Sequence, residues 1–479
     1  MQMPNFGGLP DNRVLGRPRA PSRRSRVGPR TRGRFRSCLV ASLMTAVAVG
    51  GLLGCRRDSG ATQAGSPRED ASGGANDQRA GGAKKSRGRK RAELELVKPE
   101  GVAALGGPLA ADERVILFAG DIMPWNDRGG EMRTFSEADV HYPYRGTAPL
   151  VQQADYAVGD LEAPIAVNRG KRKKFIRFPY KMPPSVLAGV SQAGFDLVSL
   201  ANNHVADYGT DAMLATIEHL TAAELPFIGL GADLASAERI HLADVGGHKV
   251  AFIACVSPET YLSNLKVASE PGAFPKRLKR MQDHVEARSD RPGSVLASVE
   301  SVVRLVERAN ELADLVVVYP HWGIRYHRPP SSRQVAIAHA AIDAGADLIV
   351  GHHIHTWQPI ETYGGAIIVY GLGNFAFDSR NSRAAESLVV RAIIARGRVD
   401  RVEIHPLATH NRHEAIRYQP KFLTGASARE LLSELATASR SHDTQLEIVG
   451  NKAIARAPIA RAPEIAPAVT SVRSSEVEP

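Results

Sequence analysis

The stretch Leu348-Ile-Val-Gly-His-His-Ile-His355 places three histidines directly after a short apolar run. Such a run predicts a buried strand, because β-branched and aliphatic side chains suit a pleated surface that is covered on both faces. Three imidazoles just beyond a strand are hard to justify by packing, because buried polar groups need partners. The stretch therefore predicts an α/β fold that carries a polar site at the end of this strand.

Similar apolar runs alternate with helical patterns from residue 112 to residue 450, which is typical of an α/β domain. The expected strands are 115–119, 156–158, 196–200, 226–228, 250–256, 315–319, 348–350, 366–370, 387–394 and 399–404. The expected helices are 185–193, 211–223, 294–313, 331–344 and 427–438. The sequence thus predicts one α/β domain over 112–450.

Polar side chains follow five of these strands. They are Asp121, Asp160, Asn203 with His204, His321, and the cluster His352, His353 and His355. The carboxyl ends of strands in an open α/β sheet face one crevice, so these residues are expected to meet there. Carboxylate and amide oxygens with neutral imidazoles form a typical divalent-metal site. Taken alone, an Asp or Asn at the end of a strand is also typical of a turn or a helix cap. Taken alone, His321 is also consistent with a histidine buried in the core. The ordered series favours a metal site.

The series and its surroundings resemble the CapA family, which is named for poly-γ-glutamate capsule synthesis and varies the calcineurin-like metallophosphoesterase pattern. The resemblance covers nearly all of residues 112–410 and implies a four-layer αββα sandwich. The motifs that carry it are Gly120-Asp121-Ile-Met123, Asp160-Leu-Glu162, Ala193-Gly-Phe-Asp-Leu-Val-Ser-Leu-Ala-Asn-Asn-His-Val-Ala-Asp-Tyr-Gly209, His321-Trp-Gly323, Asp347-Leu-Ile-Val-Gly-His-His-Ile-His-Thr-Trp-Gln-Pro-Ile-Glu361 and Leu372-Gly-Asn-Phe-Ala-Phe-Asp378.

The resemblance also implies one or two divalent ions, with Mn, Zn, Fe and Mg as the candidates. It assigns Asp121 to a first metal, Asp160 to a bridge between two, and Asn203 and His321 to the second. The histidine cluster would supply ligands to both. His353 and His355 have the favoured spacing, but His352 directly follows Gly351, so the register stays open.

Further roles follow from the same resemblance. His204 would face the substrate as a general acid or as an electrostatic stabiliser of developing charge. Glu162, Asn374 and Asp378 would orient ligands or contact the substrate.

Two departures from the family pattern bear on the chemistry. Met123 stands where the usual Asp-x-His has a histidine, and a thioether is a poor ligand for a hard ion, so the first site has lost an imidazole. Arg325 stands where family members often carry Glu, and its cation would suit an anionic substrate. The basic loop 168–177 would also hold an anionic substrate; the alternative is that this loop is a solvated run of charged residues.

The N-terminal residues 1–54 have the order of a lipoprotein-type signal peptide: ten Arg and one acid, then the apolar run 38–53, then Cys55. Sixteen apolar or small residues fall short of the roughly 20 that a membrane span needs. Leu52-Leu-Gly-Cys55 resembles a lipobox, so Cys55 is the expected lipidation site; plain secretion or an uncleaved anchor are the alternatives. We expect an exported protein, anchored to a membrane on its periplasmic or extracellular face.

The flanks of the domain are biased in composition. Residues 55–111 are rich in Gly, Ala, Ser, Lys and Arg and predict a disordered tether, and residues 451–479 predict a disordered tail. Cys255 would be left as a free, buried thiol. The net charge of +11 on 479 residues is concentrated in the leader, which alone carries +9, so nucleic acid is not expected as a partner.

Together these features predict an envelope-anchored, metal-dependent hydrolase or transferase in the biosynthesis, export or attachment of poly-γ-glutamate or a similar anionic polymer. Its expected partners are that polymer or its precursor, the membrane, and membrane proteins of capsule synthesis or export. The alternative is a non-catalytic envelope protein that binds or guides the polymer in the same cleft, which Met123 favours.

Overall fold

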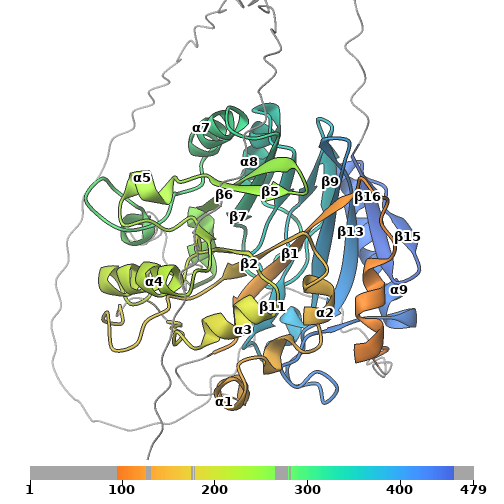
Figure 1. Cartoon of the computed structure of the whole chain (residues 1–479), viewed down its shortest axis with the longest axis horizontal. Coiled ribbons are helices and arrows are strands. Elements are labelled where there is room, and N and C mark those ends of the chain that lie inside the picture. The colour runs from red at the N-terminus through yellow and green to blue at the C-terminus, as the bar shows by residue number, and fades with distance from the viewer. Residues whose placement is uncertain are drawn as a thin grey trace, which may run out of the picture. The chain divides into compact units, whose positions relative to one another are not determined.

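The structure is a computed structural model that describes residues 94–125, 131–173, 176, 178–264, 279 and 282–457 (Figure 1). The expected signal peptide, the lipidation site Cys55, most of the tether and the tail after residue 457 lie outside the described residues. Lys174 and Arg177 of the basic loop also lie outside them. No helix in the described part of the chain is long and apolar enough to cross a membrane.

Two sheets form the centre of the domain. Among the described residues, the larger sheet has ten strands in the order β15-β16-β13-β12-β1-β2-β3-β4, with β11 paired to β1 and β14 paired to β13. They are β1 (Arg114–Met123), β2 (Tyr156–Leu161), β3 (Leu197–Ser199), β4 (Phe227–Ile228), β11 (Asn374–Phe377), β12 (Glu386–Ala395), β13 (Arg398–Ala408), β14 (Lys421–Phe422), β15 (Glu447–Val449) and β16 (Lys452–Arg456). Strands β1 to β4 run parallel.

The smaller sheet has six strands within the described ranges, in the order β5-β6-β7-β8-β10-β9. They are β5 (His241–Val245), β6 (His248–Val256), β7 (Leu315–His321), β8 (Leu348–Val350), β9 (Ile360–Tyr363) and β10 (Ala366–Val369). Strands β6, β7, β8 and β10 are parallel, so the residues that follow β7 and β8 leave at the same edge.

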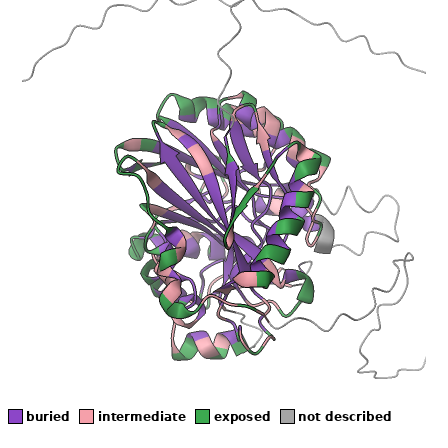
Figure 2. Ribbon diagram, turned by 90° about the vertical axis from the view of Figure 1, so that its right-hand side faces the viewer, coloured by how far each residue is buried: buried purple, intermediate pink, exposed green. Residues whose placement is uncertain are grey.

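Helices cover the outer faces of both sheets. The larger sheet packs against α1 (Glu131–Ala138), α2 (Ala148–Val151), α3 (Val186–Gln192) and α4 (Thr210–Ala222), and the smaller against α5 (Leu234–Ala237), α7 (Val299–Asn310) and α8 (Ser332–Asp343). A third hydrophobic cluster lies between the sheets and takes in α9 (Gly425–Ser439). The expected four-layer αββα sandwich is confirmed, and Figure 2 shows its buried strands between partly exposed helices.

Three expected boundaries were wrong. The expected helix 294–313 begins only at Val299, because Ser298 is extended and caps it: its hydroxyl accepts a hydrogen bond from the Ser301 amide. The folded part also starts before residue 112, since Leu96 pairs with Leu423 and the Val97 amide donates to the Phe422 carbonyl. At the other end, β16 extends the sheet beyond residue 450 by pairing with β13.

A β-bulge in β1 decides which way its last residues face. Phe118 pairs with Val158 and Asp121 with Asp160, so three steps along β1 match two steps along β2. Phe118 and Val158 both belong to the cluster between the sheets. Side chains alternate along a strand, so the extra residue brings Asp121 to this inner face together with Asp160.

Gly120 makes the bulge possible. A Cβ added at Gly120 would lie 1.7 Å from the carbonyl oxygen of Gly373, which accepts a hydrogen bond from the Asp121 amide at 3.1 Å. From the smaller sheet, the Tyr319 hydroxyl donates a hydrogen bond to the Ala119 carbonyl. The bulge is therefore held by segments on both sides of it.

We expect Gly120→Ala to destabilise the protein by about 1–3 kcal/mol, because the methyl group collides with backbone that cannot move freely. The free energy of unfolding in urea, measured on metal-free protein, tests this. Gly101→Ala is the control, since its Cβ would meet only Val97 Cγ1 at 3.5 Å, and its effect should stay within about 0.5 kcal/mol. Equal unfolding midpoints for the two variants would contradict the role given to Gly120.

Candidate metal centre

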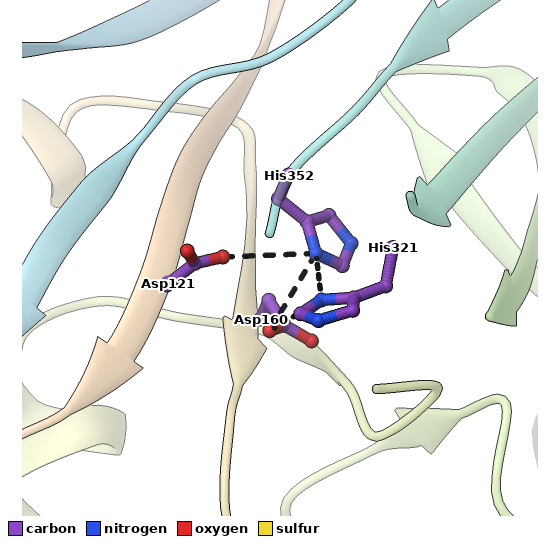
Figure 3. Close-up of side chains that lie close together, drawn as sticks. All are labelled: Asp121, Asp160, His321 and His352. Atoms are coloured by element: carbon purple, nitrogen blue, oxygen red, sulfur yellow. Dashed lines mark hydrogen bonds and ion pairs between the residues drawn. The ribbon is translucent and has the colours of Figure 1, made fainter. Parts of the chain in front are cut away.

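Four strands place one polar side chain each at the end of the apolar layer between the sheets. Phe118, Val158, Tyr319 and Val350 are the last hydrophobic residues of these strands in that layer. The next residues on the same face are Asp121, Asp160, His321 and His352. Figure 3 shows the two carboxylates and the two imidazoles converging from opposite sheets.

The four side chains lie within coordination reach of one another, and all are fully buried. His321 Nδ1 is 2.7 Å from His352 Nδ1 and 3.4 Å from Asp160 Oδ2. His352 Nδ1 is 3.5 Å from Asp160 Oδ2 and 3.7 Å from Asp121 Oδ1. Residues that follow four of the five expected strand ends thus meet in one place.

The arrangement fits a divalent cation. Asp160 Oδ2 is buried and has no hydrogen-bond partner, which is costly for a carboxylate oxygen. The Nδ1 atoms of His321 and His352 face each other at 2.7 Å. When both rings are neutral, at most one proton lies between these two nitrogens, so at least one nitrogen lone pair points into the site beside the carboxylates. A cation bound by Asp121, Asp160, His321 and His352 would satisfy them.

Burial sets the charge state of these groups. It lowers the pKa of His321 to about 3 and that of His352 to about 4, so both rings are neutral at pH 7, as metal ligands must be. Burial raises the pKa of Asp160 to about 7. Burial also opposes ionisation of Asp121, but the imidazoles of His355, His321 and His352 outweigh it and lower its pKa.

The other expected ligands surround this group. Asn203 Oδ1 lies 2.7 Å from His321 Nε2, and His353 Nδ1 lies 2.9 Å from the same atom. His353 and His355 have φ angles of +98° and +60°, so the chain after β8 is held in a left-handed conformation that turns both rings toward the centre.

Glu162 lies in the same buried site. The Glu162 carboxylate forms one candidate ligand set with His321 and His353 and another with Asp121 and His355. In each set the ligand atoms lie close enough together to share a cation. Burial raises its pKa well above the usual range, and the nearby Asp121 and Asp160 add to this effect. Glu162 and Asn374 were both expected beside the ligands, and Asn374 Oδ1 lies 2.8 Å from His355 Nδ1.

His204 stands beside the metal ligands rather than among them. Its Nδ1 is 2.7 Å from Asp207 Oδ2, and its Nε2 is 3.8 Å from Glu162 Oε1. The Tyr180 ring lies 4.4 Å from the imidazole, centre to centre. The Asp207 contact fixes the proton of His204 on Nδ1 and leaves Nε2 facing the centre.

The remaining expected residues lie further out. Arg325 is half-buried, with its guanidinium 5.2 Å from the Tyr326 ring. Burial raises the pKa of Glu162, and the charge of Arg325 partly opposes that rise. Burial lowers the pKa of His353, and the charge of Arg325 adds to that decrease. Asp378 is half-buried and belongs to none of the ligand groups found among the described residues. In the basic loop, Arg169 pairs with Glu218.

Met123 is buried in the hydrophobic cluster that packs α3 and α4 against the larger sheet. It is therefore a core residue, and nothing in its surroundings makes it a ligand.

Two residues of the site were missed by sequence reasoning. Asp207 orients His204, and Asn202 donates from Nδ2 to Asp160 Oδ1 at 3.3 Å and to the Leu161 carbonyl at 2.9 Å. Both lie in the motif around Asn203 and His204, and the three-residue spacing from His204 to Asp207 was the available signal.

Comparisons with known proteins cover the segment of the chain that carries this site. The family model described as "Bacterial capsule synthesis protein PGA_cap" matches residues 115–379. The chain is 33% identical over 258 residues to "Capsule biosynthesis protein CapA" of Bacillus anthracis, covering 52% of this chain and 57% of that protein. It is 29% identical over 333 residues to "PGA biosynthesis protein CapA" of Bacillus subtilis (strain 168), covering 69% of this chain and 80% of that protein.

The chain therefore spans little more than half the length of the Bacillus anthracis relative. A solved structure of a hypothetical protein from Thermus thermophilus covers 61% of this chain and 98% of its own, at 16% identity and a TM-score of 0.36.

Cation binding at this centre should depend on pH through Asp160. Its pKa of about 7 means that below pH 7 a cation must displace its proton, while His321 and His352 are already neutral. We expect the Kd for Mn²⁺ to rise about tenfold for each pH unit below 7 and to level off above it. Calorimetric titration from pH 5 to 8 measures this, and a constant Kd between pH 5 and 7 would contradict it.

Proposed function

Since the chain belongs to the bacterial capsule synthesis protein PGA_cap family, we propose that it is a metal-dependent hydrolase or transferase acting on an anionic capsule polymer. Poly-γ-glutamate is the polymer that the names of its relatives favour. The reaction would serve the biosynthesis, export or attachment of the polymer. We further propose that the protein is held at the cell envelope through a lipid on Cys55.

The observation that carries this proposal is the convergence of Asp121, Asp160, His321 and His352 from two sheets. Burying two carboxylates without compensation costs several kcal/mol each, so a purely structural role does not account for them. A bound cation would supply Lewis acidity toward a carbonyl or phosphoryl oxygen. The four residues would hold it, and the apolar layer behind them would keep bulk water away.

His204 would handle the proton. The Asp207 carboxylate accepts the hydrogen bond from Nδ1 and directs Nε2 toward the centre. When both ring nitrogens carry a proton, His204 would donate the Nε2 proton to the leaving group and keep the Nδ1 proton that Asp207 holds. The packing of Tyr180 on the ring limits its rotation.

Positive charge near the site supports an anionic substrate. Arg325 lies close enough to the centre for its charge to be felt by Glu162 and His353, and it is only half-buried. Arg383 also lies over the same tyrosine, with its guanidinium 5.9 Å from the Tyr326 ring. The two guanidinium groups would hold carboxylates of a polymer beside the centre.

We expect His204→Ala to lower turnover by about 10²–10⁴-fold while leaving metal content unchanged, because the proton donor is lost and the ligands remain. The assays are hydrolysis of bis(p-nitrophenyl) phosphate and release of short chains from poly-γ-glutamate, with metal content measured by mass spectrometry. Asp160→Asn should lose both the metal and the activity.

His241→Gln is the matched control, since His241 bonds the Tyr156 hydroxyl at the far end of β2 and touches no ligand. It should keep both activity and metal. Binding of poly-γ-glutamate by wild-type protein without cleavage of either compound would refute the enzymatic proposal and leave the non-catalytic alternative.

A further inference from the structure

Two pairs of basic side chains near the candidate centre form no ion pair with an acid in the described part of the chain. They are Lys173 with Lys181, the lysine pair, and Arg325 with Arg383, the arginine pair. Elsewhere many basic side chains pair with acids, as Arg304 does with Glu238 and Arg401 with Glu113. Positive charge left without an acidic partner beside a site attracts an anion.

The loop that carries Lys173 is fixed against the turn that carries His204. The Lys173 amide donates a hydrogen bond to the Asp207 carbonyl at 3.1 Å, and the Asp207 carboxylate holds His204 Nδ1 at 2.7 Å. The Lys173 side chain crosses Gly209, since a Cβ added there would lie 2.7 Å from its Nζ. The loop and the proposed proton donor therefore share one anchor, which a freely solvated run of charges would not require.

Lys181 follows the tyrosine that packs on His204. The Tyr180 ring lies 4.4 Å from the imidazole, centre to centre, and the Tyr180 amide donates to Asp207 Oδ2 at 2.7 Å. Lys181 Nζ lies 4.6 Å from the centre of the Tyr208 ring. An ammonium group that is already held over an aromatic face loses less side-chain freedom when it binds an anion.

The arginine pair is tied to the histidine turn after β8. Both guanidinium groups lie over the Tyr326 ring, that of Arg325 at 5.2 Å and that of Arg383 at 5.9 Å. The same ring lies 5.9 Å from the His355 imidazole, centre to centre. The Tyr326 amide donates to the Ile354 carbonyl at 2.7 Å, so the ring that carries the arginines is fixed beside the candidate ligands.

The order of the strands places the centre between the two pairs. In the larger sheet β12, β1, β2 and β3 are successive neighbours. Arg383 lies in the connection from β11 to β12, Asp121 and Asp160 lie on β1 and β2, and the turn that anchors Lys173 follows β3. The strands β1 to β3 alone span roughly 10 Å, so one carboxylate cannot contact both pairs.

We propose that the lysine pair and the arginine pair together bind an internal segment of a linear carboxylate polymer, which crosses the centre between them. The charges form two separate pairs rather than one dense cluster, which suits a polymer whose carboxylates are spaced along the chain by uncharged links. The chain would extend on both sides of the centre, so the protein would act within the polymer and not at its ends. This inference rests on the proposed function for the nature of the polymer.

The test is the affinity of the full chain for fluorescently labelled γ-linked glutamate oligomers, from the dimer to the dodecamer. Anisotropy measures it with Mn²⁺ present and before any cleavage is detectable. We expect the Kd to fall about tenfold or more over the series, because only the longer oligomers contact both pairs. A dodecamer that carries bulky groups at both ends should bind as tightly as the unblocked dodecamer.

Two double variants remove one pair each: Lys173→Gln with Lys181→Gln, and Arg325→Gln with Arg383→Gln. Each should bind the dodecamer about tenfold more weakly than wild type, because the remaining pair binds as it would bind a short oligomer. Lys249→Gln with Arg396→Gln is the matched control. It also removes two charges, but at the start of β6 and in the turn from β12 to β13, at the other end of the strands, and should bind like wild type.

Equal affinity for the dimer and the dodecamer would overturn this inference, as would loss of binding on blocking the ends. These two results come from wild-type protein and hold even if a variant fails to fold. A control variant that loses as much affinity as either pair would also overturn it. Tighter binding of polyphosphate of equal charge would overturn the choice of a carboxylate polymer.

The outcomes separate this inference from the proposed function. Length-dependent binding that is lost with either pair, together with no cleavage of any oligomer, would support the binding surface and refute the enzymatic proposal. Cleavage of the polymer without length-dependent binding would support the enzymatic proposal and overturn the binding surface.

Discussion

The inward orientation of Asp121 is the constraint on which the rest of the site depends. It requires one extra residue in β1, and the backbone of Gly373 crosses so closely that only glycine fits at position 120. Without the bulge, alternation would turn Asp121 toward the helices α3 and α4, and the candidate centre would lose this carboxylate. A backbone irregularity of one residue therefore decides the chemistry of the domain.

The packing of the two sheets offsets the free-energy cost of this orientation. Large apolar side chains such as Phe118, Tyr319 and Trp357 fill the layer between the sheets, and their burial opposes the cost of the polar end. The Tyr319 hydroxyl also binds the Ala119 carbonyl inside the bulge, which joins the sheets at the point where their ligands meet. The fold and the site thus depend on the same contacts.

The sequence predicts most of this site because its ligands follow strands with clear apolar runs. Val158 to Asp160 and Val350 to His352 keep the period of two, so their shared face is readable. Phe118 to Asp121 breaks that period, and the bulge that corrects it depends on Gly373, more than 250 residues away in the sequence. The ordered segment 94–111 was missed because its Gly and Ala content resembles a tether, although Leu96 finds a strand to pair with.

The same reasoning explains why position 123 contributes no side chain to the candidate centre. In an even strand, a residue two positions after Asp121 would share its face and reach the cation. Here β11 meets β1 with a second register shift, between Asp121 and Met123, and Met123 joins the hydrophobic cluster on the helical side. A histidine at 123 would then have no route to the cation without rebuilding that cluster.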